Sequence, residues 1–156
     1  MKSGKVFLDV LMGLLVLTLL GGCATGKYVP KASEELYGTW TNEKIQNNDL
    51  IQKVVYDATG WQEYTKVSDA TAIDGGTWAI DSKWSDAQGN IWYKIFCSPT
   101  KGWASGIDYE ALYKISRSST ILEWVYKRTS ASQGISYPSK IDPTSDTYHI
   151  FYRQAG

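Results

Sequence analysis

Eight runs rich in β-branched and aromatic residues follow one another along this chain, and stretches of turn-forming residues separate them. One run alternates best, and one of its faces carries Ile107, Tyr109, Ala111, Tyr113 and Ile115. A period of two with one apolar face is typical of a half-buried antiparallel strand. Strands are predicted at about 36–43, 50–57, 60–67, 75–82, 90–97, 107–116, 119–128 and 146–153.

The connections between these runs differ in length. Those at 57–60, 86–90 and 117–118 are short, and most of the others are long. In an up-and-down meander alternate connections lie at opposite ends, so one end is tight and the other is rich in loops. A sheet of eight strands tends to close, because closure removes its unpaired edges. We therefore predict an all-β fold, an eight-stranded antiparallel up-and-down barrel shaped like a cup.

Two short motifs at the ends of this region resemble those of the lipocalins and related calycin barrels. Leu36-Tyr-Gly-Thr-Trp40 is similar to the Gly-x-Trp signature of a lipocalin's first strand, and Arg153 matches the basic residue near the end of its last strand. The resemblance covers about 34–153. It implies that Trp40 closes the narrow end of the barrel, with Arg153 packed across it in a cation–π contact. The chain is shorter than most lipocalins, so a reduced, lipocalin-like barrel is expected.

Aromatic residues gather on the faces of the last three predicted strands. An eight-stranded interior has room for its own side chains or for one small ligand. Aromatic rings with a few hydroxyl groups are the usual lining of small-molecule sites, and the alternative is that these rings fill the interior completely. The predicted ligand-binding residues are Tyr109, Tyr113, Trp124, Tyr126 and Tyr148, with Trp103 in a Gly-rich loop at the open end.

No catalytic or metal-binding constellation is predicted. His149 is the only histidine, and its alternation with Tyr148 and Ile150 predicts that it faces solvent. A buried acid–base pair would need two carboxylates on the inner faces of adjacent strands, and the sequence indicates no such pair. We expect no enzymatic activity, no metal and no cofactor, and a barrel enzyme is the minority alternative. The acidic residues that alternate with apolar neighbours are interpreted as outward charges: Glu63, Asp108, Glu110 and Glu123.

The N-terminus has the layout of an export signal. A short basic start with Lys2 and Lys5 precedes an apolar stretch at 6–20, and Leu20-Gly-Gly-Cys23 ends it. This ending resembles the lipobox of bacterial lipoproteins, which implies cleavage after residue 22 and a lipid on the Cys23 thiol. The alternative is an uncleaved anchor. The uncharged part, 10–22, is shorter than the roughly 20 residues that a membrane-spanning helix needs.

Three parts of the chain follow from this interpretation: a signal peptide at 1–22, a lipidated tether at 23–33 and the barrel domain at 34–156. Ala24 after the cysteine favours the outer membrane by the family's sorting tendency, so we expect a lipid-anchored protein of the bacterial envelope that faces the periplasm. With Cys23 committed to lipid, Cys97 has no intrachain partner and is expected to be a small buried hydrophobe.

Two functions fit these observations. The first is binding of a small apolar or amphipathic, lipid-like ligand inside the barrel. The alternative is a filled barrel that docks on another envelope protein, as an inhibitor or assembly accessory, through its open-end loops. The long connection at 129–145 is mostly polar but contains the apolar residues Ile135 and Tyr137. Apolar residues in such a loop indicate a lid, a docking surface or a simple cover of the mouth. Sixteen basic and sixteen acidic residues give the chain no net positive charge, so its charge does not indicate binding to nucleic acid.

The lipid anchor can be tested by one substitution. Cys23→Ser is expected to move the protein from the membrane pellet to the soluble fraction, because each buried methylene of the lost acyl chains contributes about 0.8 kcal/mol to membrane binding. Ultracentrifugation of cell extracts measures this partition. Cys97→Ala is the matched control and is expected to stay in the pellet. Retention of Cys23→Ser in the pellet would contradict lipidation at this residue.

Overall fold

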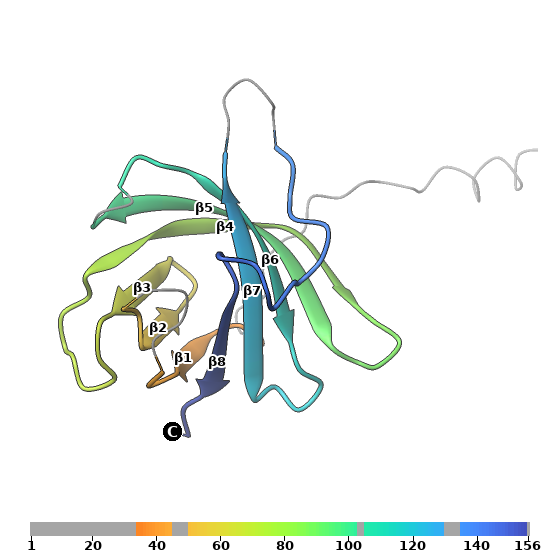
Figure 1. Ribbon diagram of the computed structural model, residues 1–156, viewed down its shortest axis with the longest axis horizontal. Helices are drawn as coiled ribbons and strands as arrows, with labels where there is room; N and C mark the ends of the chain where they lie inside the picture. Colours follow the sequence, from red (N-terminus) through yellow and green to blue (C-terminus); the bar gives the residue numbers. More distant parts are fainter. Residues whose placement is uncertain (1–33, 45–49, 103–104, 130–134, 156) are drawn as a thin grey trace, which may run out of the picture.

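The computed structural model describes residues 34–44, 50–102, 105–129 and 135–155. Each strand in these residues pairs antiparallel with the next, and the last returns to the first, which gives a closed barrel (Figure 1). The described part contains strands but no helix, so the predicted all-β up-and-down barrel is confirmed, and it is compatible with a lipocalin-like fold. The strands are β1 (Gly38–Thr41), β2 (Lys53–Tyr56), β3 (Trp61–Tyr64), β4 (Asp74–Ser85), β5 (Ile91–Lys101), β6 (Tyr109–Ile115), β7 (Ile121–Arg128) and β8 (His149–Arg153).

Several predicted features lie outside the described residues. These are the signal peptide, the tether with Cys23, and Trp103. Within the described ranges, no helix is long and apolar enough to cross a bilayer.

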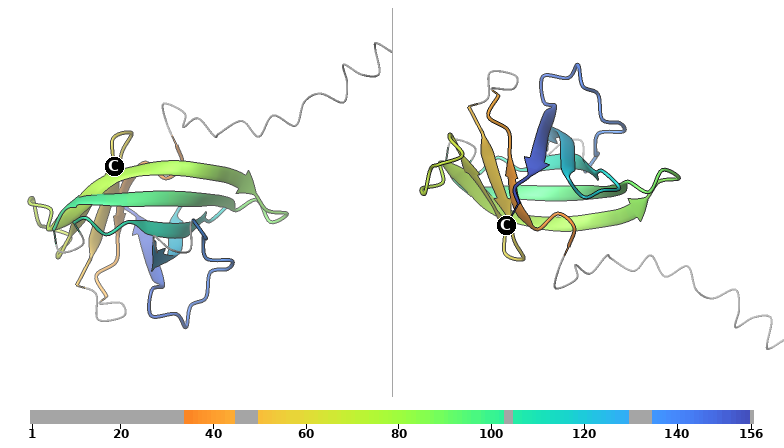
Figure 2. Two further views of the ribbon diagram at one scale, coloured as in Figure 1. Left: turned by 90° about the horizontal axis from the view of Figure 1, so that it is seen from above. Right: turned by 90° about the horizontal axis from the view of Figure 1, so that it is seen from below.

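Strands β4 and β5 are longer than predicted and form a hairpin that projects beyond the barrel wall (Figure 2). Their register shifts between Gly75 and Gly76, where Pro99 stands opposite Gly76. Proline in a strand is confined to edges and bulges, since it cannot donate to the ladder. A Cβ atom on Gly76 would lie 2.2 Å from the Ser98 carbonyl oxygen, so only glycine allows this close approach.

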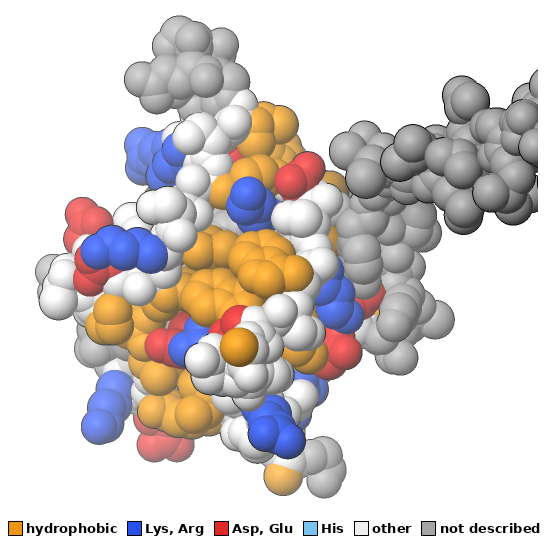
Figure 3. Space-filling view, turned by 90° about the vertical axis from the view of Figure 1, so that its right-hand side faces the viewer, with side chains coloured by type: hydrophobic (Ala, Val, Ile, Leu, Met, Phe, Trp, Pro, Cys, Tyr) orange, Lys and Arg blue, Asp and Glu red, His pale blue; other side chains and the backbone are white. Residues whose placement is uncertain are grey.

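The projecting hairpin carries aromatic residues on its outer side. Trp84 and Trp92 stack with their ring centroids 6.0 Å apart, and Trp84 is 41% exposed. Figure 3 views the molecule from the side toward which this hairpin projects, and shows apolar side chains gathered among charged ones.

The tight end of the barrel is closed by Trp40 and Arg153, which the structure brings together. The Arg153 guanidinium carbon lies 4.2 Å from the centroid of the Trp40 ring, and the ring is fully buried. The indole N–H of Trp40 donates to the Leu36 carbonyl at 2.8 Å. Arg153 donates to the carbonyl oxygens of Tyr37 at 2.9 Å and Ser119 at 2.7 Å. One guanidinium therefore joins the first strand, the last strand and the β6–β7 turn.

The segment 135–148 packs against the outer face of the barrel and runs alongside β6 and β7 (Figure 1). The ring of Tyr137 lies 5.6 Å from the Lys94 amine on β5, and the Tyr148 hydroxyl donates to Glu123 on β7 at 2.9 Å. Leu112 and Val125, on outward-facing positions of adjacent strands, are buried. Tyr137 thus packs on the outside wall, while Ile135 is exposed.

Glu110 occupies an outer-face position, as predicted, but its side chain is buried rather than exposed. Its carboxylate lies 3.7 Å from the Lys127 amine on β7. Glu110 is therefore an outward charge that is nevertheless buried, because the outer wall here is itself covered.

Removing the Trp40 ring should destabilise the barrel strongly. Trp40→Ala is expected to lower the free energy of unfolding by about 3–5 kcal/mol, the usual cost of truncating a buried tryptophan. Trp84→Ala, which removes the half-exposed ring, is the control and is expected to cost about 1.5 kcal/mol or less. Urea unfolding followed by far-ultraviolet circular dichroism measures both values. Equal losses would show that Trp40 does not hold the floor.

Candidate ligand-binding site

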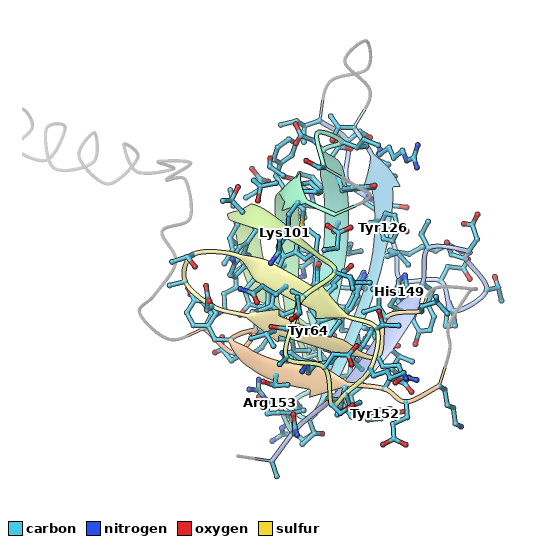
Figure 4. All side chains as sticks on the ribbon, turned by 90° about the vertical axis from the view of Figure 1, so that its left-hand side faces the viewer. Tyr64, Lys101, Tyr126, His149, Tyr152 and Arg153 are labelled. Atoms are coloured by element: carbon cyan, nitrogen blue, oxygen red, sulfur yellow. The ribbon has the colours of Figure 1, made fainter. Side chains whose placement is uncertain are left out.

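A cavity of about 60 Å³ lies inside the barrel at the end opposite Trp40 and Arg153. Its lining comes from β3 to β8 and from Ile51, which precedes β2. Figure 4 shows Tyr126 and His149 on neighbouring strands, well above Arg153 at the closed end. The cavity therefore occupies the mouth half of the predicted cup.

Four of the predicted ligand-binding residues line this cavity together: Tyr109, Tyr113, Trp124 and Tyr126. Their rings pack on one another. Tyr109 meets Tyr126 edge-on at 5.3 Å between centroids, and Tyr113 stacks on Trp124 at 5.4 Å. Such pairs hold ring faces in fixed orientations. The sequence pattern of β6 and β7 thus placed these four rings together on the inner face.

Tyr113 in the lining is paired with a second buried tyrosine, Tyr56. The hydroxyl oxygens of Tyr56 and Tyr113 share a hydrogen bond of 3.0 Å. Burial raises the pKa of both hydroxyls well above the ordinary value, so both stay protonated. Beneath them the interior is filled with buried side chains such as Tyr93 and Phe151.

Glu63 and Asp74 face each other across β3 and β4 on the inner side of the barrel. They are direct register partners, and both line the cavity. The outward orientation predicted for Glu63 was therefore wrong. Glu63 stands two residues after Trp61, which also lines the cavity, and residues two apart share a face. Asp74 is fully buried, and its Oδ1 accepts a hydrogen bond from the Gly75 backbone N–H at 2.7 Å.

His149 also lines the cavity, although it was predicted to face solvent. It is buried, and its ring stacks on Trp124 at 5.2 Å and on Tyr126 at 5.9 Å between centroids. Arg153 at the floor points inward, and alternation along β8 then places Phe151 and His149 inward as well. That alternation is the signal that could have found His149.

Alternation along β8 also places Tyr148, next to His149, on the outer face and away from the cavity. Its side chain lies outside the barrel, where its hydroxyl is bonded to Glu123, so its predicted role in ligand binding was wrong. Tyr152, on the same face of β8 as Tyr148, is 49% exposed.

The cavity also contains donors that the sequence analysis did not single out. Trp61 is 9% exposed, and its buried indole N–H has no hydrogen-bond partner among the residues that the structure describes. Cys97 is buried in the lining, as expected, and burial raises the pKa of its thiol to about 12.

The arrangement combines an aromatic wall with two carboxylates and an imidazole. In the described part of the chain, no group of three or more His, Cys, Asp and Glu side chains is placed to hold a metal ion.

Comparison of the chain with protein-family models, with curated proteins and with solved structures found no match. The function of the cavity therefore has to be argued from its own chemistry.

Burial of Cys97 has a measurable consequence. At pH 8 a thiol with a pKa of about 12 is ionised in only about one molecule in ten thousand, and the thiolate is the reactive form. Cys97 is therefore expected to resist iodoacetamide in the native protein and to react within minutes in urea. Peptide mass mapping after each treatment locates the label. Labelling of native Cys97 at the rate of the unfolded chain would contradict this burial.

Proposed function

We propose that this protein is a lipid-anchored protein of the bacterial envelope whose barrel binds one small amphipathic ligand in the mouth cavity. The observation that carries this proposal is the mixed lining of a cavity inside a closed barrel. Aromatic rings supply apolar area, while Glu63, Asp74 and His149 supply polar groups that orient a ligand. The anchor is Cys23, by the resemblance of its surroundings to a lipobox.

The size of the cavity limits what enters it. Sites that enclose a drug-sized molecule have volumes of roughly 300–1,000 Å³, so about 60 Å³ takes only one end of such a ligand. A purely apolar end would leave the carboxylates and the imidazole against hydrocarbon, which is costly. The polar end of the ligand is therefore the part that enters, and the apolar remainder lies toward the mouth loops. Among the ligands expected from the sequence, this favours the amphipathic ones.

The proposal is binding rather than catalysis. The nucleophiles in the lining, Cys97 and Tyr113, are held in their protonated and unreactive forms by burial. The carboxylate pair is then a group that recognises a ligand.

Native mass spectrometry tests the proposal on the chain that starts at residue 23 and carries Cys23→Ser, exported and purified without detergent. This chain retains every described strand and the whole core. We expect an adduct of a few hundred daltons that is lost on denaturation. Trp124→Ala should weaken it, because Trp124 forms the wall between Tyr113 and His149. Trp84→Ala, on the outer hairpin, should leave it unchanged.

A clean apo mass, with no uptake from an envelope lipid extract, would overturn ligand binding. The alternative function, docking on another envelope protein through the open-end loops, would then be the interpretation to pursue.

A further inference from the structure

We propose that the projecting β4–β5 hairpin rests on the membrane that holds the lipid anchor, through the stacked rings of Trp84 and Trp92, so that the mouth of the barrel faces away from this membrane. The inference rests on the lipid anchor in the proposed function, because it names the surface of the barrel that the anchoring membrane contacts.

The two tryptophans form a preformed aromatic surface near the end of the hairpin. Trp84 and Trp92 are register partners, and their rings are nearly parallel, with 10° between the planes. The Trp92 indole N–H donates to Oδ2 of Asp86 at 2.8 Å. The other oxygen of this carboxylate accepts from the backbone N–H groups of Gln88 at 3.0 Å and Asn90 at 2.9 Å. Because the turn and the rings are already held in place, a contact through them costs little side-chain ordering.

The end of this hairpin suits the boundary between lipid headgroups and acyl chains. Tryptophan is enriched at that boundary, since its ring is apolar and its N–H is polar, and Trp84 is exposed. The exposed residues of the turn are uncharged: Ala87, Gln88 and Gly89. The carboxylate of Asp86 is held by the hydrogen bonds of the turn. The hairpin can therefore enter the boundary without burying an unpaired charge.

The described chain begins beside this hairpin. Lys83 precedes Trp84 on β4 and makes an ion pair of 2.7 Å with Glu34, the first described residue. The Tyr93 hydroxyl on β5 donates to the same carboxylate at 3.1 Å. Cys23 precedes Glu34 by eleven residues, which span at most about 40 Å when fully extended. The membrane that holds a lipid on Cys23 therefore lies within about this distance of the hairpin.

The charged side chains near the rings do not form a basic patch. The Lys114 amine lies 5.8 Å from the centroid of the Trp92 ring, but it is paired with Glu123 at 2.9 Å. Arg117 is exposed, and a Cβ atom built on Gly89 would lie 3.2 Å from its Cδ atom, so its stem passes beside the turn. One guanidinium there can bind a lipid phosphate. Docking is therefore expected to depend on the tryptophans and only weakly on anionic lipid.

The mouth is the competing surface for this contact. Its exposed apolar side chains come from three separate connections, and each is aliphatic: Leu50, Ile73 and Ile135. Single exposed apolar side chains are normal on protein surfaces, whereas the stacked tryptophans form one continuous apolar surface on a projecting hairpin (Figure 3). The two orientations bring opposite ends of the barrel to the lipid, so a probe at each end distinguishes them.

A fluorescent label at each end tests the orientation. The full chain with its lipid is reconstituted in phosphatidylcholine vesicles that contain a spin-labelled phosphatidylcholine. Gln88→Cys places a thiol at the exposed tip of the hairpin, and Ser136→Cys places one beside Ile135 at the mouth. Lipid occupies Cys23 and burial protects Cys97, so each variant takes one nitrobenzoxadiazole label. We expect the label at position 88 to emit at shorter wavelength and to be quenched, and the label at position 136 to emit as in water.

Further substitutions assign the contact to the rings. In the Gln88→Cys chain, Trp84→Ser is expected to shift the emission back toward that in water and to reduce the quenching. Ala87→Glu, which adds a charge at the exposed tip, is a second variant with the same expected effect. Tyr152→Ser removes an exposed ring from β8, which is not adjacent to β4 or β5, and is the matched control with unchanged emission.

Quenching at position 136, with water-like emission at position 88, would overturn the inference and turn the mouth toward the membrane. Water-like emission at both positions, in vesicles that carry the protein, would also overturn it and assign the tryptophan pair to a protein partner. A chain that does not float with the vesicles in a sucrose gradient would instead overturn the lipid anchor itself.

Discussion

Pairing of β1 with β8 closes the sheet, and this closure determines which side of every strand is inside. Trp40 and Arg153 are register partners across that seam, and both turn inward, where the guanidinium lies on the indole ring. Side chains alternate strictly along a strand, so the inward position of Arg153 also directs Phe151 and His149 into the barrel. The contact between Trp40 and Arg153 therefore also determines that His149, at the other end of β8, points into the cavity.

This dependence explains why some faces were predictable and one was not. β6 and β7 each carry one clearly apolar face, and that face is the inner one. β8 carries apolar side chains on both faces, with Phe151 buried inside and Tyr152 half exposed outside. Composition alone therefore could not show which face of β8 lies inside the barrel. The expectation that Arg153 packs inside on Trp40 and the expectation that Tyr148 lines the interior contradict each other by alternation, and the first one was correct.

The acid pair was harder to predict, since it depends on register as well as on periodicity. Asp74 was placed in a loop before its strand, whereas in the structure β4 begins at Asp74 and pairs with β3 from there. The register with β5 shifts beside it, between Gly75 and Gly76. A slip of one residue would turn Asp74 to the outer face. Glu63 was equally ambiguous, because its strand has aromatic residues on both sides, Trp61 inside and Tyr64 outside under the Lys53 amine.

The barrel is filled at one end and hollow at the other. The filled end provides stability, and the hollow end provides the candidate binding site. The floor half is packed with fully buried side chains such as Trp40, Tyr93 and Phe151, and the cavity lies above it, at the mouth. Packing of the floor contributes the free energy that a small domain needs. The mouth half can then hold the buried polar side chains Asp74 and His149. A ligand that binds only the folded barrel stabilises the fold from this half.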